Sequence, residues 1–294
     1  MDVLLQISIR KRLIVWVGLL GFVNMLHLLY TERRFLIVFH PSKIKKNKFE
    51  IISQGCTLRG FVLCPEGTGK FPAVIVSHGF ASSTHDTKQY AMVFVEEGYV
   101  AVCFDFCMSG SGRSSGSSLG MSVMTEKVDL LNVLDYIKQL DFVDSNHITL
   151  AGCSQGGLVS ALAAVERESE IERLILYYPA FCIPDNARNG RMLNAKFDPD
   201  HVPEKFWAIF VRLGSKYIYD AIRLEPFREI CSFQKPVFIV HGIEDKLVDI
   251  NYSRRASKEY PNCQLAEVSG DHGFRRKGFE ASKRVTVEYL RSGH

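Results

Sequence analysis

From residue 49 onward, short runs of β-branched and aromatic residues alternate with segments in which apolar residues recur at helical spacing. Short apolar runs are typical of strands buried on both faces, and the 3.6-residue repeat is typical of helices that cover a sheet. This alternation predicts an α/β fold with a mostly parallel sheet. An opening hairpin is expected over 49–67. The other expected strands are 72–76, 99–106, 147–152, 171–180, 236–242 and 264–270, and the expected helices are 87–97, 125–140, 155–166, 252–260 and 279–290.

Three segments add detail to this pattern. In the helix expected over 125–140, an apolar stripe predicts one buried face. Residues 109–118 are a Gly/Ser run without the spacing of a phosphate-binding loop, so they predict a surface connection. Residues 181–232 interrupt the alternation with four prolines and eight aromatic residues, and they predict an inserted cap. The stripe consists of Val128, Leu131, Leu134 and Ile137.

The charge is unevenly distributed along the chain. The 294 residues are 47% hydrophobic and 23% charged with a formal net charge of +4, a globular composition. Residues 1–48 hold nine Lys and Arg and two acidic residues, a local charge of +7, whereas residues 49–294 carry −3. The main domain therefore has no basic surface to favour nucleic acid, and no nucleic-acid partner is expected.

Residues 13–30 contain no charged side chain and would form a helix about 27 Å long, enough to cross a thin bilayer. Basic residues flank the run on both sides, and no small-residue cleavage site follows it. We predict a membrane anchor within a basic segment, 1–48. A buried amphipathic helix, or a chain that starts at Met25, are the alternatives.

The basic carboxyl-side flank of this run favours a domain that faces the cytoplasm, and a soluble cytoplasmic protein is the alternative. The eight cysteines show no CxxC and no metal-ligand spacing, and most lie in apolar runs. They predict reduced, buried thiols and neither disulfides nor a zinc site.

A candidate nucleophile lies in the sequence GCSQG at 152–156, which matches GxSxG. The motif falls between an expected strand and an expected helix, the context in which it presents a serine on a tight turn. Small residues two positions on either side let the backbones pass. We therefore expect Ser154 to be the nucleophile.

A serine nucleophile needs a base and an acid. His272 follows the last expected strand, at the sheet edge where ligands collect, and is preferred over His78 and His241, which also end strands. Asp245 follows the preceding strand and fits the order serine, acid, histidine. Glu244 and Asp249 are the alternative acids.

The developing oxyanion requires two backbone donors. The residue after the nucleophile, Gln155, supplies one, and the loop after the strand at 72–76 supplies the other. There we expect the N–H of Phe80, with Gly79 allowing the backbone to approach the ester.

The motifs SHGF, GCSQGG, HGxxDxxV and GDHGF together resemble the α/β-hydrolase superfamily over residues 49–294. The sequence is more narrowly similar to bacterial cinnamoyl (feruloyl) esterases, through QGG at 155–157, YPA at 178–180, DPDHVP at 198–203 and the SGDHGF loop. The resemblance implies a Ser-Asp-His triad on Ser154, Asp245 and His272, oxyanion donors at Phe80 and Gln155, and a small cap.

Two positions depart from that family. Cys153 stands where a histidine is usual, and the cap stretch 184–193 offers Asp185 or Asn186 but no glutamine for a phenolic hydroxyl. Tyr217 and Tyr219 are further candidates for substrate contact.

The sequence thus predicts a serine carboxylester hydrolase for a small-molecule ester with a medium acyl or aromatic group, without metal or cofactor. A serine aminopeptidase or an acyltransferase would use the same residues. A non-catalytic, membrane-tethered binding protein is the alternative from another class. The oligomeric state is not predicted.

Overall fold

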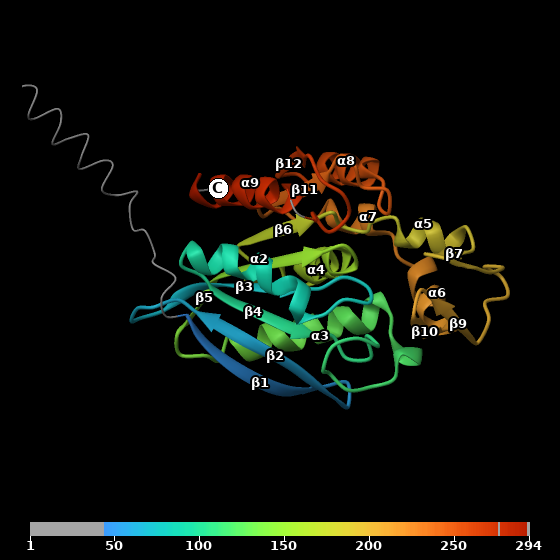
Figure 1. Cartoon of the computed structure of the whole chain (residues 1–294), viewed down its shortest axis with the longest axis horizontal. Helices are drawn as coiled ribbons and strands as arrows, with labels where there is room; N and C mark the ends of the chain where they lie inside the picture. Colours follow the sequence, from blue (N-terminus) through green and yellow to red (C-terminus); the bar gives the residue numbers. More distant parts are fainter. Residues whose placement is uncertain (1–43, 276, 293–294) are drawn as a thin grey trace, which may run out of the picture. The chain divides into compact units, whose positions relative to one another are not determined.

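The computed structural model describes residues 44–275 and 277–292. Their central feature is an eight-stranded sheet in the order β1-β2-β4-β3-β5-β6-β11-β12 (Figure 1). The first two neighbouring pairs are antiparallel and the others parallel, which confirms the predicted α/β class with its opening hairpin. The strands are β1 (Lys45–Ser53), β2 (Cys56–Cys64), β3 (Phe71–Ser77), β4 (Val100–Asp105), β5 (Val143–Cys153), β6 (Arg173–Tyr177), β11 (Val237–Gly242) and β12 (Cys263–Val268).

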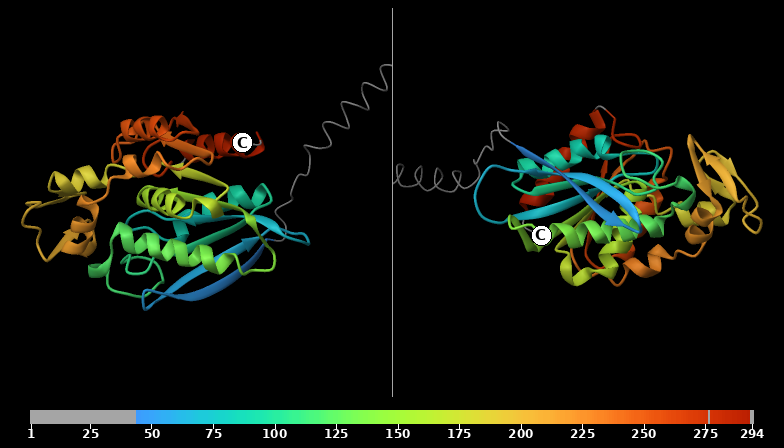
Figure 2. Two further views of the ribbon diagram at one scale, coloured as in Figure 1. Left: turned by 180° about the vertical axis from the view of Figure 1, so that it is seen from behind. Right: turned by 90° about the horizontal axis from the view of Figure 1, so that it is seen from below.

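Helices cover both faces of this sheet (Figures 1 and 2). Alternate residues of β3 belong to two separate cores: Ala73 and Ile75 pack with α3, α4 and α8, whereas Val74 and Val76 pack with α2 and α9. This two-sided burial explains the continuous apolar runs in the sequence. The covering helices are α2 (Thr84–Glu96), α3 (Val123–Ile137), α4 (Gln155–Glu166), α8 (Ile250–Glu259) and α9 (Lys277–Arg291), with short 3₁₀ turns η2 (Ser118–Gly120) and η3 (Glu168–Glu170).

Several expected boundaries differ from those of the structure by a few residues, and local chemistry explains three of these differences. α2 and α3 begin earlier than expected because Ser83 and Ser122 cap them, the latter in a reciprocal capping box with Thr125. β1 begins at Lys45, inside the basic segment predicted over 1–48. Its exposed lysines suit an edge strand, but in the sequence they resemble a solvated segment.

The predicted stripe on α3 was partly wrong. Leu131, Leu134 and Ile137 are buried, but the side chain of Val128 is 38% exposed. The buried face instead includes two acidic residues, Glu126 and Asp129.

The segment predicted as a cap, 181–232, lies between β6 and β11, which are neighbours in the sheet. Its elements extend at one end of the sheet in all three views (Figures 1 and 2). Because adjacent strands flank it, the segment adds structure without interrupting the sheet. Its elements are α5 (Ile183–Arg188), β7 (Arg191–Met192), β8 (Ala195–Lys196), β9 (Lys205–Ala208), β10 (Val211–Gly214), α6 (Ser215–Ile222) and α7 (Pro226–Ile230).

The predicted membrane anchor, 13–30, lies outside the described residues. Within 44–275 and 277–292, no helix combines the length and the apolar character needed to cross a membrane.

Candidate active site

Ser154 occupies a strained turn between β5 and α4, with φ 53° and ψ −118°. A residue with a side chain pays a conformational penalty at positive φ, and such strain collects at functional sites. The turn is tight enough to require glycine on both sides. A Cβ on Gly152 would lie 2.2 Å from the carbonyl oxygen of Gly156, and one on Gly156 would lie 2.3 Å from that of His78. These contacts explain the two glycines of the GxSxG motif.

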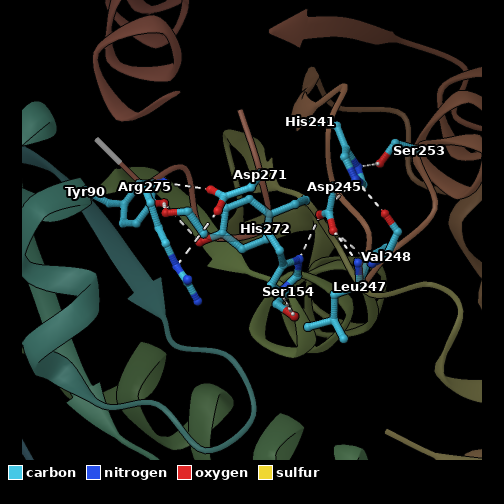
Figure 3. Close-up of polar contacts among 12 residues, drawn as sticks. Tyr90, Ser154, His241, Asp245, Leu247, Val248, Ser253, Asp271, His272 and Arg275 are labelled. Carbon is cyan, nitrogen blue, oxygen red and sulfur yellow. Dashed lines mark hydrogen bonds and ion pairs between the residues drawn. The ribbon is translucent and has the colours of Figure 1, made fainter. Parts of the chain in front are cut away.

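The structure brings the three predicted catalytic side chains into one hydrogen-bonded row (Figure 3). His272 Nε2 lies 3.1 Å from Ser154 Oγ, and His272 Nδ1 lies 2.7 Å from Asp245 Oδ2. They come from the ends of β5, β11 and β12, which meet at one edge of the parallel sheet.

Four hydrogen bonds hold the carboxylate of Asp245, whose side chain is fully buried. Its Oδ1 accepts from the backbone N–H groups of Leu247 and Val248 at 2.8 and 3.0 Å, and its Oδ2 contacts both His272 and His241. Burial alone would raise the pKa of Asp245, but the bonds from His241, His272 and the Val248 N–H outweigh it and hold the pKa below its usual range. Because an ionised carboxylate only accepts, His272 carries its proton on Nδ1 and turns the lone pair of Nε2 toward Ser154.

His241, one of the alternative bases, supports the acid instead. Its Nε2 lies 3.2 Å from Asp245 Oδ2 and 3.1 Å from the Val248 carbonyl oxygen. Both are acceptors, so this nitrogen donates, and Nδ1 accepts from the Ser253 hydroxyl at 2.7 Å. A fully buried ring with both nitrogens engaged cannot act as a base toward Ser154.

His78, the other alternative, is also buried and engaged. Its Nε2 accepts from the Phe106 N–H at 3.0 Å, and its Nδ1 donates to the Gly79 carbonyl at 2.8 Å. Burial lowers the pKa of His78. The alternative acids serve elsewhere as well, since Asp249 caps α8 and Glu244 accepts from Ser269 and Gly270.

A pair of tyrosines supports the His272 loop from the α2 side. The ring of Tyr178 packs edge-on against the His272 ring at 4.7 Å between centroids. The Tyr178 hydroxyl is 2.9 Å from that of Tyr90, which donates to the Gly273 carbonyl at 3.3 Å. The imidazole is therefore held both by Asp245 and by packing.

The predicted oxyanion donors lie beside the nucleophile. Gln155 is the first residue of α4, and a Cβ on Gly79 would lie 3.1 Å from Ser154 Cβ, which places the Phe80 backbone near the serine. Within the described chain, the N–H groups of Phe80 and Gln155 donate to no protein acceptor. Both are available to a ligand, and the positive end of the α4 dipole favours a negative one.

The Gln155 side chain is fixed by two buried partners. Its Nε2 donates to Glu126 Oε2 at 2.7 Å, and its Oε1 accepts from the Tyr217 hydroxyl at 2.5 Å. Burial raises the pKa of Glu126 to about 8, although the bond from Gln155 opposes this rise. Tyr217 is fully buried and its hydroxyl is engaged, so the structure does not support the predicted substrate contact by Tyr217.

The other predicted substrate contacts do not line the cavity at Ser154. Asp185 pairs with Arg188 and accepts from the Tyr252 hydroxyl at 3.0 Å. Its neighbour Asn186 lies on the same short helix, α5, and Tyr219 is 41% exposed on α6.

A cavity of about 680 Å³ opens on Ser154 and His272. Aromatic and aliphatic side chains form part of its wall beside the polar Ser82, Thr87 and Gln89, and this apolar part suits an acyl or aryl group. Asp86 and Arg275 are the charged residues of the lining. In the described part of the chain, no group of three His, Cys, Asp or Glu residues is placed to hold a metal ion. The apolar lining comprises Phe80, Tyr90, Tyr178, Leu193, Ile209, Leu247, Phe274 and Phe279.

The structure is similar to that of Est1E from Butyrivibrio proteoclasticus with ferulic acid bound. The two share 30% identity and a TM-score of 0.78, over 83% of this chain and 98% of Est1E. The chain belongs to the α/β-hydrolase family. It is an esterase-like hydrolase, most similar to the cinnamoyl and feruloyl esterases, as the sequence resemblance indicates.

Other comparisons give matches of lower identity or smaller coverage. The serine aminopeptidase (S33) family model matches residues 70–206, which include the nucleophile but not the acid or the histidine. The α/β hydrolase GrgF from Penicillium sp. sh18 has a TM-score of 0.67 at 16% identity, over 84% of this chain and 97% of GrgF, which shows the fold. An uncharacterised 31.7 kDa protein of Escherichia coli is 30% identical over 119 residues, and this alignment spans 40% of each chain.

Three structural partners of the site in this α/β-hydrolase were missed from the sequence: Glu126, the supporting role of His241, and Tyr178. His241 left a signal, because it precedes Asp245 by four residues in HGxxDxxV. Glu126 left none, because the predicted apolar stripe of α3 placed Val128 on the buried face in its stead. Tyr178 left none, because its packing on His272 depends on how β6 and the last loop meet.

Proposed function

We propose that this α/β-hydrolase is a serine carboxylester hydrolase that acts through an acyl-enzyme. One observation carries the proposal: Ser154, on a strained turn, lies 3.1 Å from a histidine whose other nitrogen lies 2.7 Å from a buried carboxylate. The unbonded N–H groups of Phe80 and Gln155 beside the serine support it further. Nucleophile, base, orienting acid and oxyanion donors are the groups that acyl transfer requires.

In acylation, Ser154 Oγ attacks the ester carbonyl carbon while its proton passes to His272 Nε2. The N–H groups of Phe80 and Gln155 stabilise the oxyanion. The tetrahedral species collapses, the bond to the alcohol oxygen breaks, and His272 returns the proton to the departing alkoxide. Asp245 stabilises the imidazolium throughout without taking its proton.

In deacylation, a water molecule takes the place of the alcohol. His272 removes a proton from this water, the hydroxide adds to the acyl carbon, and collapse breaks the bond to Ser154 Oγ. The proton returns to that oxygen, so the enzyme is regenerated and a carboxylic acid is released.

The cavity supports an ester with an aromatic or medium-length acyl group. Part of its wall consists of aromatic rings and aliphatic side chains, and the similar Est1E structure contains ferulic acid. A hydroxycinnamoyl ester is therefore the first substrate to test. Without a glutamine in the cap stretch 184–193, any contact to a phenolic hydroxyl has to come from other groups.

The test compares Ser154→Ala with Ser257→Ala. Ser257 is a half-buried serine on α8 that does not line the cavity at Ser154. With p-nitrophenyl butyrate and methyl ferulate, we expect Ser154→Ala to lower kcat by at least about 10³-fold, and Ser257→Ala to stay within about twofold of wild type. A fluorophosphonate should label Ser154 in wild type and in Ser257→Ala, but should not label Ser154→Ala. Equal rates in both variants, with matching circular dichroism spectra, would refute the assignment.

A serine aminopeptidase is the second candidate, because the matching family model carries that description. The same groups would cleave an amide if the cavity bound a free amino terminus. Asp86 is the carboxylate in the lining that can pair with such an ammonium group. Aminoacyl p-nitroanilides, assayed beside the esters, decide between the two: turnover of the anilides that Asp86→Asn abolishes would favour the peptidase.

A further inference from the structure

A second and larger cavity, of about 790 Å³, lies near the edge of the sheet that β1 forms, beside α2. It shares no lining residue with the cavity at Ser154. It is formed where the beginning of α2 meets β1 and β2. The register places the charged strand residues of its lining on one face, since Lys48 pairs with Phe61 and Glu50 with Arg59.

Positive charge dominates the lining of this cavity. β1 contributes Lys46 and Lys48, β2 contributes Arg59, α2 contributes Lys88, and the loop after β4 contributes Arg113. Two carboxylates, Glu50 and Asp105, also line it. The cavity thus carries an excess of three positive charges.

Both carboxylates are already engaged. Glu50 pairs with Arg59 at 2.9 Å, and Asp105 accepts from the backbone N–H groups of Thr84 and Arg113 at 2.6 and 2.9 Å. Among the described residues, no carboxylate lies within ion-pair distance of the remaining four cations. Those cations are Lys46, Lys48, Lys88 and Arg113.

The charge of Lys46 interacts unfavourably with those of the other three cations. The pKa of Lys46 is lowered, first by burial and then by the charge of Lys88, with smaller effects from Lys48 and Arg113. Its ammonium lies 3.8 Å from the centre of the Phe61 ring, which holds it over the wall of the cavity. An excess of like charges is unfavourable, and an anion among these cations would relieve the repulsion.

We infer that this cavity binds a phosphate-bearing anion through Lys46, Lys48, Lys88 and Arg113. A phosphate carries up to two negative charges and several acceptor oxygens, so it can engage several cations together, whereas a carboxylate carries one charge. The volume suits a phosphorylated small molecule or the headgroup of an anionic lipid. The Thr84 N–H at the start of α2 already donates to Asp105, so the side chains would hold the anion.

The first experiment measures binding of inorganic pyrophosphate to the full chain by isothermal titration calorimetry. Lys46→Gln/Lys88→Gln removes two of the four cations. Lys196→Gln/Lys258→Gln removes the same charge from β8 and α8, outside the cavity. We expect saturable binding by wild type at low salt, at least tenfold weaker binding by the cavity variant, and a change below about twofold in the control variant.

The second experiment separates the two sources of phosphate. Sedimentation compares the same three proteins on phosphatidylcholine vesicles with and without phosphatidylinositol 4-phosphate. A loss of vesicle binding confined to the cavity variant identifies a lipid headgroup, and a loss of pyrophosphate binding alone identifies a soluble phosphate compound. Ester hydrolysis should be unchanged in both variants and serves as the folding control. Equal binding of both probes by the two variants, or no binding of either by wild type, overturns the inference.

Discussion

The buried carboxyl of Glu126 gives the folded protein a pH dependence that one substitution can isolate. Burial raises the pKa of Glu126 to about 8, although the bond from Gln155 opposes this rise. An exposed glutamate has a pKa of about 4.3. Between these two values the folded state keeps a proton that the unfolded state has released. Stability therefore falls as the pH rises from about 4 to about 8.

The size of this loss follows from the difference between the two pKa values. Each pKa unit corresponds to ~1.4 kcal/mol, so wild type should lose about 3 to 4 kcal/mol between pH 5 and pH 8 through this group. In Glu126→Gln the amide stays neutral and still accepts from Gln155, so the variant lacks this loss. Any fixed cost of fitting the extra amide hydrogen is the same at every pH.

Urea unfolding at pH 5, 6, 7 and 8, followed by circular dichroism, measures the effect. We expect the stability of Glu126→Gln relative to wild type to increase by about 3 to 4 kcal/mol across this range. Asp129, whose pKa burial also raises, titrates in both proteins, so its contribution largely cancels. Glu66→Gln, at an exposed loop position, is the control and should follow wild type. Parallel curves for wild type and Glu126→Gln would refute the reasoning.

Further predictions concern the support of the site. His241→Ala removes a donor from the buried carboxylate of Asp245, so the free energy of unfolding at pH 7 should fall by about 2 to 4 kcal/mol; an unchanged urea midpoint would contradict this. Tyr217→Phe leaves the Gln155 amide oxygen buried and unpaired. The free energy of unfolding should fall by about 1 to 3 kcal/mol, and KM for p-nitrophenyl butyrate should not change. A large rise in KM would instead indicate that Tyr217 contacts the substrate. Ile209→Gly relieves a left-handed backbone and opens the cavity wall, so KM for aryl esters should change while kcat for p-nitrophenyl acetate stays within about twofold.

The order and type of the main elements were predictable because the sheet is buried on both faces. Such strands appear in the sequence as continuous apolar runs. Because β5, β11 and β12 are parallel, the residues that follow them lie at one edge of the sheet. The positions of Ser154, Asp245 and His272 along the chain therefore implied that they would meet. The helix starts were less accurate, because serine caps such as Ser83 and Ser122 act over a few residues and leave little trace in a hydrophobic pattern.

The buried polar groups were not predictable from apolar periodicity. Counting only apolar residues on α3 placed Val128 on the inner face and left Glu126 and Asp129 outside, the reverse of what the structure shows. An acidic side chain is buried only when partners satisfy it, and here those partners come from distant segments. Gln155 donates to Glu126, and Ser53 and Gln54 donate to Asp129.

The segment predicted as a cap meets the proposed active site in two physically different ways. On α6, Tyr217 is fully buried and hydrogen-bonded to the side chain of Gln155, so this contact ties the segment to the helix that follows the nucleophile. At the cavity wall, Leu193 and Ile209 both adopt φ of 54°, and the Asn194 side chain accepts from the Ile209 N–H. Ile209 is also half exposed. A buried polar contact resists change because each partner left unpaired is costly, whereas a strained and exposed wall can be altered at little cost to the core. Substrate preference in this enzyme can therefore vary at the wall while the contact that positions Gln155 stays fixed.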